Sequence, residues 1–346
     1  MALIGWKPLV ANFAMPSARI RCSNIIRNFP AGPIRVEVFR EQDFATRYDA
    51  VIFSKNYSEE SIAQAEALKK NGKKVIFDLF DNRIFSPDDS DESRALNDRL
   101  SRMIALSDHL TTSTPFLKEL LSTHAPDRTI TNIEDAVEQS VTIDEDGLGK
   151  RLRAYLHLLL YRAKLQAEGD KTRLVWFGTS GDKRLKTGMA DLLKLKDVLH
   201  DARFKDRVVL SLCSNGKKTF DEYFADWTIP LVFINWNAAT FYDVLQANHV
   251  ALIPVTPNPL TYYKTNNRVI TALYNNLAVI ADEIPSYKEF EHCITLNDWE
   301  AGLTRFVGNE ASRKSAVAEG RRIIERKYLP AQIAAKWEAF LSGAVK

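Results

Sequence analysis

The feature that most constrains the fold is a repeated alternation of short apolar runs with longer amphipathic segments. In the first part of the chain, we expect strands at residues 2–9, 34–39, 49–55, 73–81, 109–114 and 129–137. Segments with helical spacing lie between them, at residues 17–29, 58–72, 94–108 and 115–124. Gly72 is expected just past the end of one helix, and Pro115 at the start of another. Because the runs are mostly apolar throughout, they favour a parallel sheet covered on both faces.

The alternation stops after residue 139 and then starts again. Residues 140–170 contain no strand pattern, but hold a basic amphipathic stretch at residues 148–165. Further strands are expected at residues 172–181, 207–215, 231–236, 250–256, 277–282 and 293–298, with a helix at 188–202. The rest of the chain, from Trp299 to Lys346, has a mainly helical pattern.

This order predicts two tandem Rossmann-like α/β domains, since 346 residues exceed what one ordinary core holds. We expect a first domain over residues 1–140, a helical linker over 141–170, a second domain over 171–322 and a C-terminal helix over 323–346. This helix has apolar residues on one face and is expected to cross back to the first domain; they are Ile333, Trp337, Phe340 and Leu341.

Composition excludes several classes of protein. A net charge of +3 gives no reason to expect nucleic acid as a partner, although it tolerates anionic small molecules. The cysteines, Cys22, Cys213 and Cys293, lie far apart and form no metal-binding pattern, so no metal site is expected. The first residues resemble a strand rather than a signal peptide, and no apolar run reaches the length of a membrane span. The sequence therefore predicts a cytoplasmic protein.

Polar loops follow four strands of the second half. Gly178, Thr179 and Ser180 follow the first of them, Ser214 follows the second and Trp236 the third. The fourth loop begins after Val255 and combines asparagines and threonines with Lys264. Ligands bind at the carboxyl ends of strands in open α/β sheets. One such loop is also typical of ordinary solvent-exposed turns, but four at one edge favour an anion site.

The segment after the fourth of these strands has the clearest pattern. Residues 260–276 are expected to be helical, with Thr265 as the N-cap of a helix that starts near Asn266. Lys264, Arg268 and Thr271 then lie on one stripe. Free N–H groups of the first turn, together with the two cations, would hold an anion. A solvated helix face is the alternative.

Two groups of charged residues stand out in the first half. Asp78 and Asp81 end a strand, where carboxylates serve in hydroxyl binding, in general base catalysis or in helix capping. Arg19 and Arg21 lie near a helix N-terminus, where the macrodipole disfavours cations. This position suggests an anionic ligand, or a contact with the acidic loop near Asp88.

The order of these motifs resembles the nucleotide-sugar glycosyltransferases of the GT-B fold, in particular the bacterial family 4-like ("group 1") enzymes. In that group, an aliphatic strand containing proline is followed by Asn-Pro, a Lys-Ser/Thr-Asn triplet, a helix, a strand and a Pro-x-Tyr turn. The corresponding residues here are 251–255, Asn258-Pro259, Lys264-Thr265-Asn266, the helix to Asn276, 277–281 and Pro285-Ser286-Tyr287. Residues 174–181 resemble the first strand and turn of the donor domain, and residues 75–82 and 107–121 resemble units of the acceptor domain.

The resemblance implies a glycosyltransferase that binds a nucleotide-diphosphate sugar on the second domain, with retention of configuration favoured over inversion. The acceptor would be a glycan or a lipid-linked molecule, and neither a metal nor another cofactor is implied. The implied catalytic residues are Asp78, Asp81 and Lys264. The implied donor-binding residues are Gly178, Thr179, Ser180, Ser214, Trp236, Lys264, Thr265, Asn266 and Arg268. The implied acceptor-binding residues are Arg19, Arg21 and Asn82.

The sequence departs from this family at two positions. Where retaining members carry two glutamates with seven residues between them, this chain has Tyr263 and Thr271. Two alternatives therefore stay open, a non-catalytic GT-B protein that serves as partner or scaffold, and a nucleotide-sugar epimerase of the same fold.

The basic stretch at residues 148–165 has its own alternatives. One helix face is shared by apolar residues, namely Leu152, Tyr155, Leu156, Leu159 and Leu160. Five cations accompany them: Lys150, Arg151, Arg153, Arg162 and Lys164. The pattern is typical of a helix that lies on an anionic membrane surface, here the inner face, and also of an interdomain helix with a buried apolar face.

Overall fold

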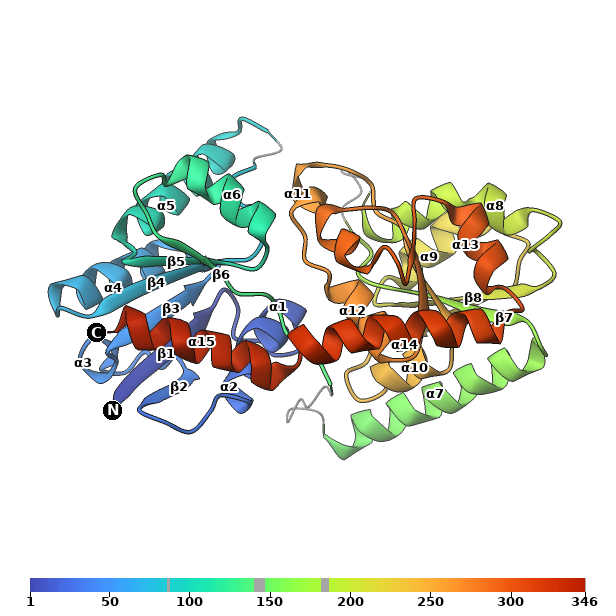
Figure 1. Ribbon diagram of the computed structural model, residues 1–346, viewed down its shortest axis with the longest axis horizontal. Coiled ribbons are helices and arrows are strands. Elements are labelled where there is room, and N and C mark those ends of the chain that lie inside the picture. The colour runs from blue at the N-terminus through green and yellow to red at the C-terminus, as the bar shows by residue number, and fades with distance from the viewer. Residues whose placement is uncertain (86–87, 140–146, 182–186, 346) are drawn as a thin grey trace. The chain divides into compact units, whose positions relative to one another are not determined.

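The computed structural model describes residues 1–85, 88–139, 147–181 and 187–345 (Figure 1). The chain forms two compact units. The first domain consists of residues 1–138, 258–265 and 326–346, and the second of residues 139–257 and 266–325. The chain therefore passes from one domain to the other more than once, and the short segment 258–265 belongs to the first domain.

The first domain contains a parallel sheet with the strand order β2-β1-β3-β4-β5-β6. The strands are β1 (Ala2–Pro8), β2 (Ile34–Val38), β3 (Ala50–Ser54), β4 (Lys74–Leu79), β5 (His109–Thr112) and β6 (Ile130–Asn132). The α-helices are α1 (Pro16–Ala18), α2 (Asn24–Arg27), α3 (Phe44–Arg47), α4 (Glu59–Lys70), α5 (Asp91–Leu106), α6 (Pro115–His124), α11 (Pro259–Tyr262) and α15 (Pro330–Ala344). A π-helical turn, Arg19–Ser23, joins α1 to α2.

Both faces of this sheet are covered, because successive side chains of a strand point to opposite faces. On β1, Ile4 and Trp6 pack in a core with α2 and α15, while Leu3 packs on the other side with α4 and α5. The helices on the two sides can be followed in Figure 1. As a consequence, the central strands carry mostly apolar residues on both faces, as the sequence indicated.

The second domain contains a parallel sheet with the order β12-β11-β10-β7-β8-β9. Its strands are β7 (Thr172–Phe177), β8 (Val208–Ser214), β9 (Leu231–Asn235), β10 (Val250–Ile253), β11 (Ala278–Ala281) and β12 (Thr295–Leu296). Its α-helices are α7 (Leu148–Ala167), α8 (Lys196–His200), α9 (Lys217–Tyr223), α10 (Phe241–Gln246), α12 (Asn267–Tyr274), α13 (Trp299–Phe306) and most of α14 (Glu310–Lys327). Two 3₁₀ segments are Gly188–Leu195 and Pro285–Phe290.

The structure confirms the predicted fold class, two Rossmann-like domains with a C-terminal helix that returns to the first. Trp337 of α15 is fully buried, and its ring centroid lies 4.6 Å from that of Trp6 in β1. Gly72 follows Asn71, the C-cap residue of α4, and has a φ of 67°, and Thr114 caps α6 ahead of Pro115. These local signals therefore act as the sequence indicated.

Two predicted helices differ from the observed ones. The segment 260–276 is not one helix: α11 ends at Tyr262, and α12 begins after Asn266, which replaces Thr265 as the N-cap residue. The break is where the chain passes from the first domain to the second. The expected helix at 188–202 begins as a 3₁₀ segment and becomes α-helical only at Lys196.

Candidate functional site

The second sheet grows in two directions from β7. β8 and β9 lie on one side of β7, whereas β10, β11 and β12 lie on the other. Ligands of open α/β sheets bind beside the carboxyl ends of strands at such a switch point. Gly178, Thr179 and Ser180 follow β7 there, and Thr179 and Ser180 are exposed. The sequence therefore identified the loop at the switch point.

Close backbone contacts fix the base of this loop. Gly181 and Gly188 both have positive φ angles, 84° and 79°, and a Cβ atom on Gly181 would lie 1.8 Å from the carbonyl oxygen of Thr187. A Cβ atom on Gly216, after β8, would lie 2.8 Å from Cβ of Ser180. Glycine is required at these positions because other residues would push the chain segments apart.

Arg268 lies against the end of β7. A Cβ atom on Gly178 would fall 2.6 Å from Nη2 of Arg268 and 3.0 Å from the ring of Trp176. The guanidinium carbon of Arg268 lies 5.8 Å from the centroid of that ring. Gly178 thus leaves the space that the guanidinium occupies. The structure brings together two predicted donor-binding residues, from the first turn of α12 and from the loop after β7.

The other predicted residues of the second domain lie at the same edge of the sheet. Ser214 is fully buried at the end of β8, and its Oγ accepts a hydrogen bond from the N–H of Gly216 at 3.3 Å. The N–H of Trp236, after β9, donates to the carbonyl oxygen of Ser214 at 3.1 Å. Asn266 is buried at the start of α12, where the first N–H groups have no partner within the helix.

Two carboxylates that the sequence analysis did not single out, Asp191 and Asp282, hold these loops together. Asp191 accepts hydrogen bonds from the N–H groups of Gly188 and Thr256, both at 2.8 Å, and so joins the loop after β7 to the loop after β10. Asp282, after β11, accepts from the N–H of Val255 at 2.6 Å and also pairs with Lys194. These residues gave no signal in the sequence, because single acids in helices and loops are usually exposed.

In the first domain, Asp81 lies between two lysines. Nζ of Lys264 is 2.8 Å from Oδ1 of Asp81, and Lys55 bonds the other carboxylate oxygen. Although burial opposes ionisation, the two ammonium groups hold the pKa of Asp81 well below its usual range. Burial lowers the pKa of Lys55, and Asp81 counteracts that effect. Lys55 has a φ of 54°, a conformation that residues with a side chain rarely adopt.

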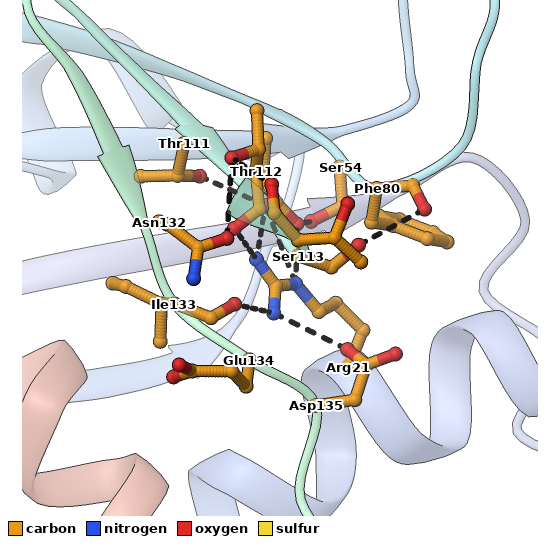
Figure 2. Close-up of polar contacts among 12 residues, drawn as sticks. Arg21, Ser54, Phe80, Thr111, Thr112, Ser113, Asn132, Ile133, Glu134 and Asp135 are labelled. Carbon is orange, nitrogen blue, oxygen red and sulfur yellow. Dashed lines mark hydrogen bonds and ion pairs between the residues drawn. The ribbon is translucent and has the colours of Figure 1, made fainter. Parts of the chain in front are cut away.

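Asp78 has a different environment, although it lies only three residues earlier. It is fully buried and accepts hydrogen bonds from Ser54 Oγ at 2.7 Å and Thr111 Oγ1 at 2.8 Å. Arg21 donates to both of its oxygens, through Nη2 at 2.7 Å and Nε at 3.1 Å. Figure 2 shows Arg21 reaching from its helix to the strand ends.

Arg21 also contacts the chain after β6. Its Nη1 donates to the carbonyl oxygen of Ile133 at 2.5 Å and to Asp135 at 3.2 Å, and its Nη2 donates to the carbonyl oxygen of Thr112 at 3.3 Å. Together with Asp78, these acceptors engage all five N–H groups of the guanidinium. The contacts support a structural role for the buried pair of Arg21 and Asp78.

The remaining predicted acceptor residues also have partners within the first domain. Arg19 forms a buried ion pair with Glu138. Asn82 donates to the carbonyl oxygen of Pro259 at 3.0 Å and accepts from the N–H groups of Ile84 and Phe85. The anionic partners of Arg19 and Arg21 thus come from β4 and the chain after β6, where the sequence had suggested a ligand or the loop near Asp88.

Among the described residues, no group of three or more histidines, cysteines and acids could hold a metal ion. Cys22, Cys213 and Cys293 are free and buried, and burial raises the pKa of Cys213 to about 12. Such thiols are not nucleophiles at neutral pH.

Two Rossmann-like domains, with a C-terminal helix that returns to the first, define the class of fold as GT-B. No protein-family model matches the sequence, and no curated protein is similar to it in sequence. Solved structures do resemble it. The crystal structure of Anabaena Alr3699/HepE in complex with UDP and glucose matches with a TM-score of 0.66 and 12% identity, over 99% of this chain and 100% of that chain.

Two further structures match over most of this chain. An α,α-trehalose 6-phosphate synthase from Burkholderia multivorans matches with a TM-score of 0.61 and 10% identity, over 99% of this chain and 96% of that chain. TarM matches with a TM-score of 0.60 and 13% identity, over 84% of this chain and 54% of that chain. At these identities, the likeness shows the fold alone.

Proposed function

We propose that this chain is a family 4-like glycosyltransferase, which transfers a sugar from a nucleoside-diphosphate sugar to a glycan or a lipid-linked acceptor. The observation that carries the proposal is the guanidinium of Arg268 against Gly178, at the switch point of the second sheet. A guanidinium in this place can make charge-assisted hydrogen bonds to a diphosphate. The structural neighbour Alr3699/HepE was crystallised with UDP and glucose, which supports this choice of donor.

The donor would lie along the carboxyl edge of the second sheet. Arg268 and the first N–H groups of α12 would bind the diphosphate, with the backbone after Gly178 beside them. Ser214 and Trp236, at the ends of the next strands, would border the rest of the donor. Positioning and neutralisation of the departing diphosphate supply the catalysis, and we propose that no cofactor takes part.

The acceptor would bind to the first domain, near the cluster of Asp81, Lys55 and Lys264. Because its pKa is low, Asp81 is ionised at neutral pH and has no proton to donate. Its proposed role is to hold the two ammonium groups in place. Lys264 is then a candidate for binding an anionic group of either substrate. Retention of configuration stays a prediction from the resemblance.

One observation favours a second candidate, a GT-B protein that binds the donor without transferring its sugar. The positions that carry glutamates in the resembling family are Tyr263 and Thr271 here, and Thr271 is buried. No carboxylate therefore stands at either position to bind the ribose or the sugar.

A turnover assay decides between the two. The protein would be incubated with a panel of nucleotide sugars and a mixture of glycan and lipid-linked acceptors, and released nucleoside diphosphate would be measured with and without acceptor. Acceptor-dependent release with a glycoside product supports the transferase, and NMR of its anomeric proton gives the stereochemistry. Saturable binding with no release supports the non-catalytic protein. Release without any glycoside product, together with an altered sugar, would point to an epimerase.

A further inference from the structure

Helix α7 has two apolar faces, and only one of them is used within the domain. Its buried residues are Ala154, Leu158, Tyr161 and Leu165. These positions follow a spacing of three and four residues, so they form one stripe along the helix. This stripe packs on the second domain beside β9.

Hydrogen bonds fix the rotation of α7 about its axis. The hydroxyl of Tyr161 donates to Ser211 Oγ at 2.9 Å and accepts from Asn248 Nδ2 at 2.7 Å. All three side chains are buried. Burial raises the pKa of Tyr161 to about 12, so this hydroxyl keeps its proton at neutral pH. The helix therefore cannot turn its other face inward without breaking buried hydrogen bonds.

The other face carries a second apolar stripe that is exposed to solvent. Its side chains have exposed fractions between 47% and 71%; they are Leu152, Tyr155, Leu156, Leu159 and Leu160. At about 100° per residue, this stripe is centred about 150–160° away from the buried one. Five of the twelve large hydrophobic residues that are exposed in the described part of the chain lie here. Such a concentration marks an interaction surface.

Cations border this stripe along both edges. On the helical wheel, Arg151 and Arg162 fall on one side of it, and Arg153 and Lys164 on the other. Arg162 also pairs with Asp243 at 2.8 Å, where both side chains remain partly exposed. Residues 148–167 contain no acid. The stripe with its basic edges therefore matches a partner that is apolar within and anionic at its surface.

We propose that α7 is a membrane-contact helix, which lies in the plane of an anionic bilayer with its exposed leucines at the boundary of the acyl chains. Two attractions hold such helices to a membrane: leucines bury apolar surface in the interface, and cations pair with the anionic headgroups. None of the helices in the described parts of the chain is long and apolar enough to cross a bilayer. The contact depends on α7 alone and not on the proposed enzymatic activity.

Sedimentation of the full chain with lipid vesicles tests the proposal. The probes are vesicles of phosphatidylcholine alone and of phosphatidylcholine mixed with phosphatidylglycerol. The wild type is expected to sediment with the mixed vesicles and to bind the neutral ones at least about tenfold more weakly, since each cation near an anionic surface adds about 1 kcal/mol. The double variant Leu156→Ser/Leu159→Ser, and separately Arg153→Glu/Lys164→Glu, should lose most of the binding.

A matched variant separates local from overall charge. Lys205→Glu/Arg322→Glu makes the same change in net charge at exposed positions outside α7, and it should bind like the wild type. Thermal unfolding followed by circular dichroism checks that all variants fold, which is expected because every changed side chain faces solvent.

Three results would overturn the proposal. One is equal binding of the wild type to anionic and neutral vesicles. Another is unchanged binding of the folded stripe variants. The third is a dimer of the wild type in analytical ultracentrifugation that Leu156→Ser/Leu159→Ser converts to monomers, because the stripe would then be an interface between two copies of the chain.

Discussion

At the scale of single residues, two carboxylates of one segment of the first domain have different environments. Asp78 is enclosed with Arg21, whereas Asp81 is partly exposed between Lys55 and Lys264. A buried ion pair stabilises little relative to apolar residues, but removing one partner leaves the other charge uncompensated. The two acids should therefore differ in how much stability is lost when each is replaced, and Asp78 contributes to the stability of the fold.

Asp78→Asn is expected to lower the free energy of unfolding by about 3 kcal/mol, because Arg21 loses the acceptor that binds it through two nitrogens. Urea unfolding followed by tryptophan fluorescence measures this change. Asp91→Asn is the matched control, since Asp91 pairs with Arg94 at 2.6 Å on the surface, and it should change stability by less than about 0.5 kcal/mol. Equal effects of the two substitutions would contradict a structural role for Asp78.

The sequence indicated these residues but not their partners. Polar residues directly after an apolar run are visible in any α/β sequence, which is why Asp78, Asp81 and Gly178 could be predicted. Glu138 and Asp135, which pair with Arg19 and Arg21, are distant in sequence from the arginines. No local pattern links residues that only the sheet topology brings together.

At the scale of helices and strands, close packing depends on small residues at particular positions. Gly320 of α14 faces Leu273 of α12, and a Cβ atom there would lie 2.6 Å from Cδ1 of that leucine. The sequence predicted the helices from their spacing. The predicted start of α12 was one residue early, and the prediction joined α11 to α12 in one helix. The chain passes between the domains at residue 265, and the spacing of apolar residues does not reveal this passage.

Gly320→Ala is expected to destabilise the second domain by about 1–2 kcal/mol, since the cost of overpacking against Leu273 exceeds the gain in helix propensity. Gly343→Ala provides the contrast. A Cβ atom at Gly343 of α15 would meet nothing within 4 Å, so this substitution should raise the free energy of unfolding by about 0.4–1 kcal/mol. Thermal unfolding of both variants gives the comparison. A stabilised Gly320→Ala variant would show that the two helices are free to separate.

At the scale of the whole molecule, the first domain is assembled from separate segments of the chain, residues 1–138, 258–265 and 326–346. The first domain is completed only by α15, at the end of the chain, which packs on α2 and β2 (Figure 1). The sequence predicted this return because two domains need a tether and the tail exceeds what one sheet needs for cover. Core packing around Trp337 includes the guanidinium of Arg21, 5.1 Å from the indole ring.

Trp337→Ala is expected to destabilise the first domain by about 3–5 kcal/mol through the cavity that it leaves beside Trp6. Hydrogen exchange followed by mass spectrometry would locate the effect. Protection should fall in strands β1 to β6, while strands β7 to β12 keep theirs. A loss of protection confined to residues 171–325 would mean that α15 supports the second domain instead.

Isothermal titration calorimetry tests whether the second domain binds a nucleoside diphosphate through Arg268. Nucleoside diphosphates, beginning with UDP, would be titrated into the wild type, Arg268→Ala and the exposed control Arg322→Ala. We expect Arg268→Ala to weaken binding about ten- to a hundredfold, since a charge-assisted contact contributes about 1.5–3 kcal/mol. Arg322→Ala should bind like the wild type. Equal affinity of Arg268→Ala and the wild type would contradict the account.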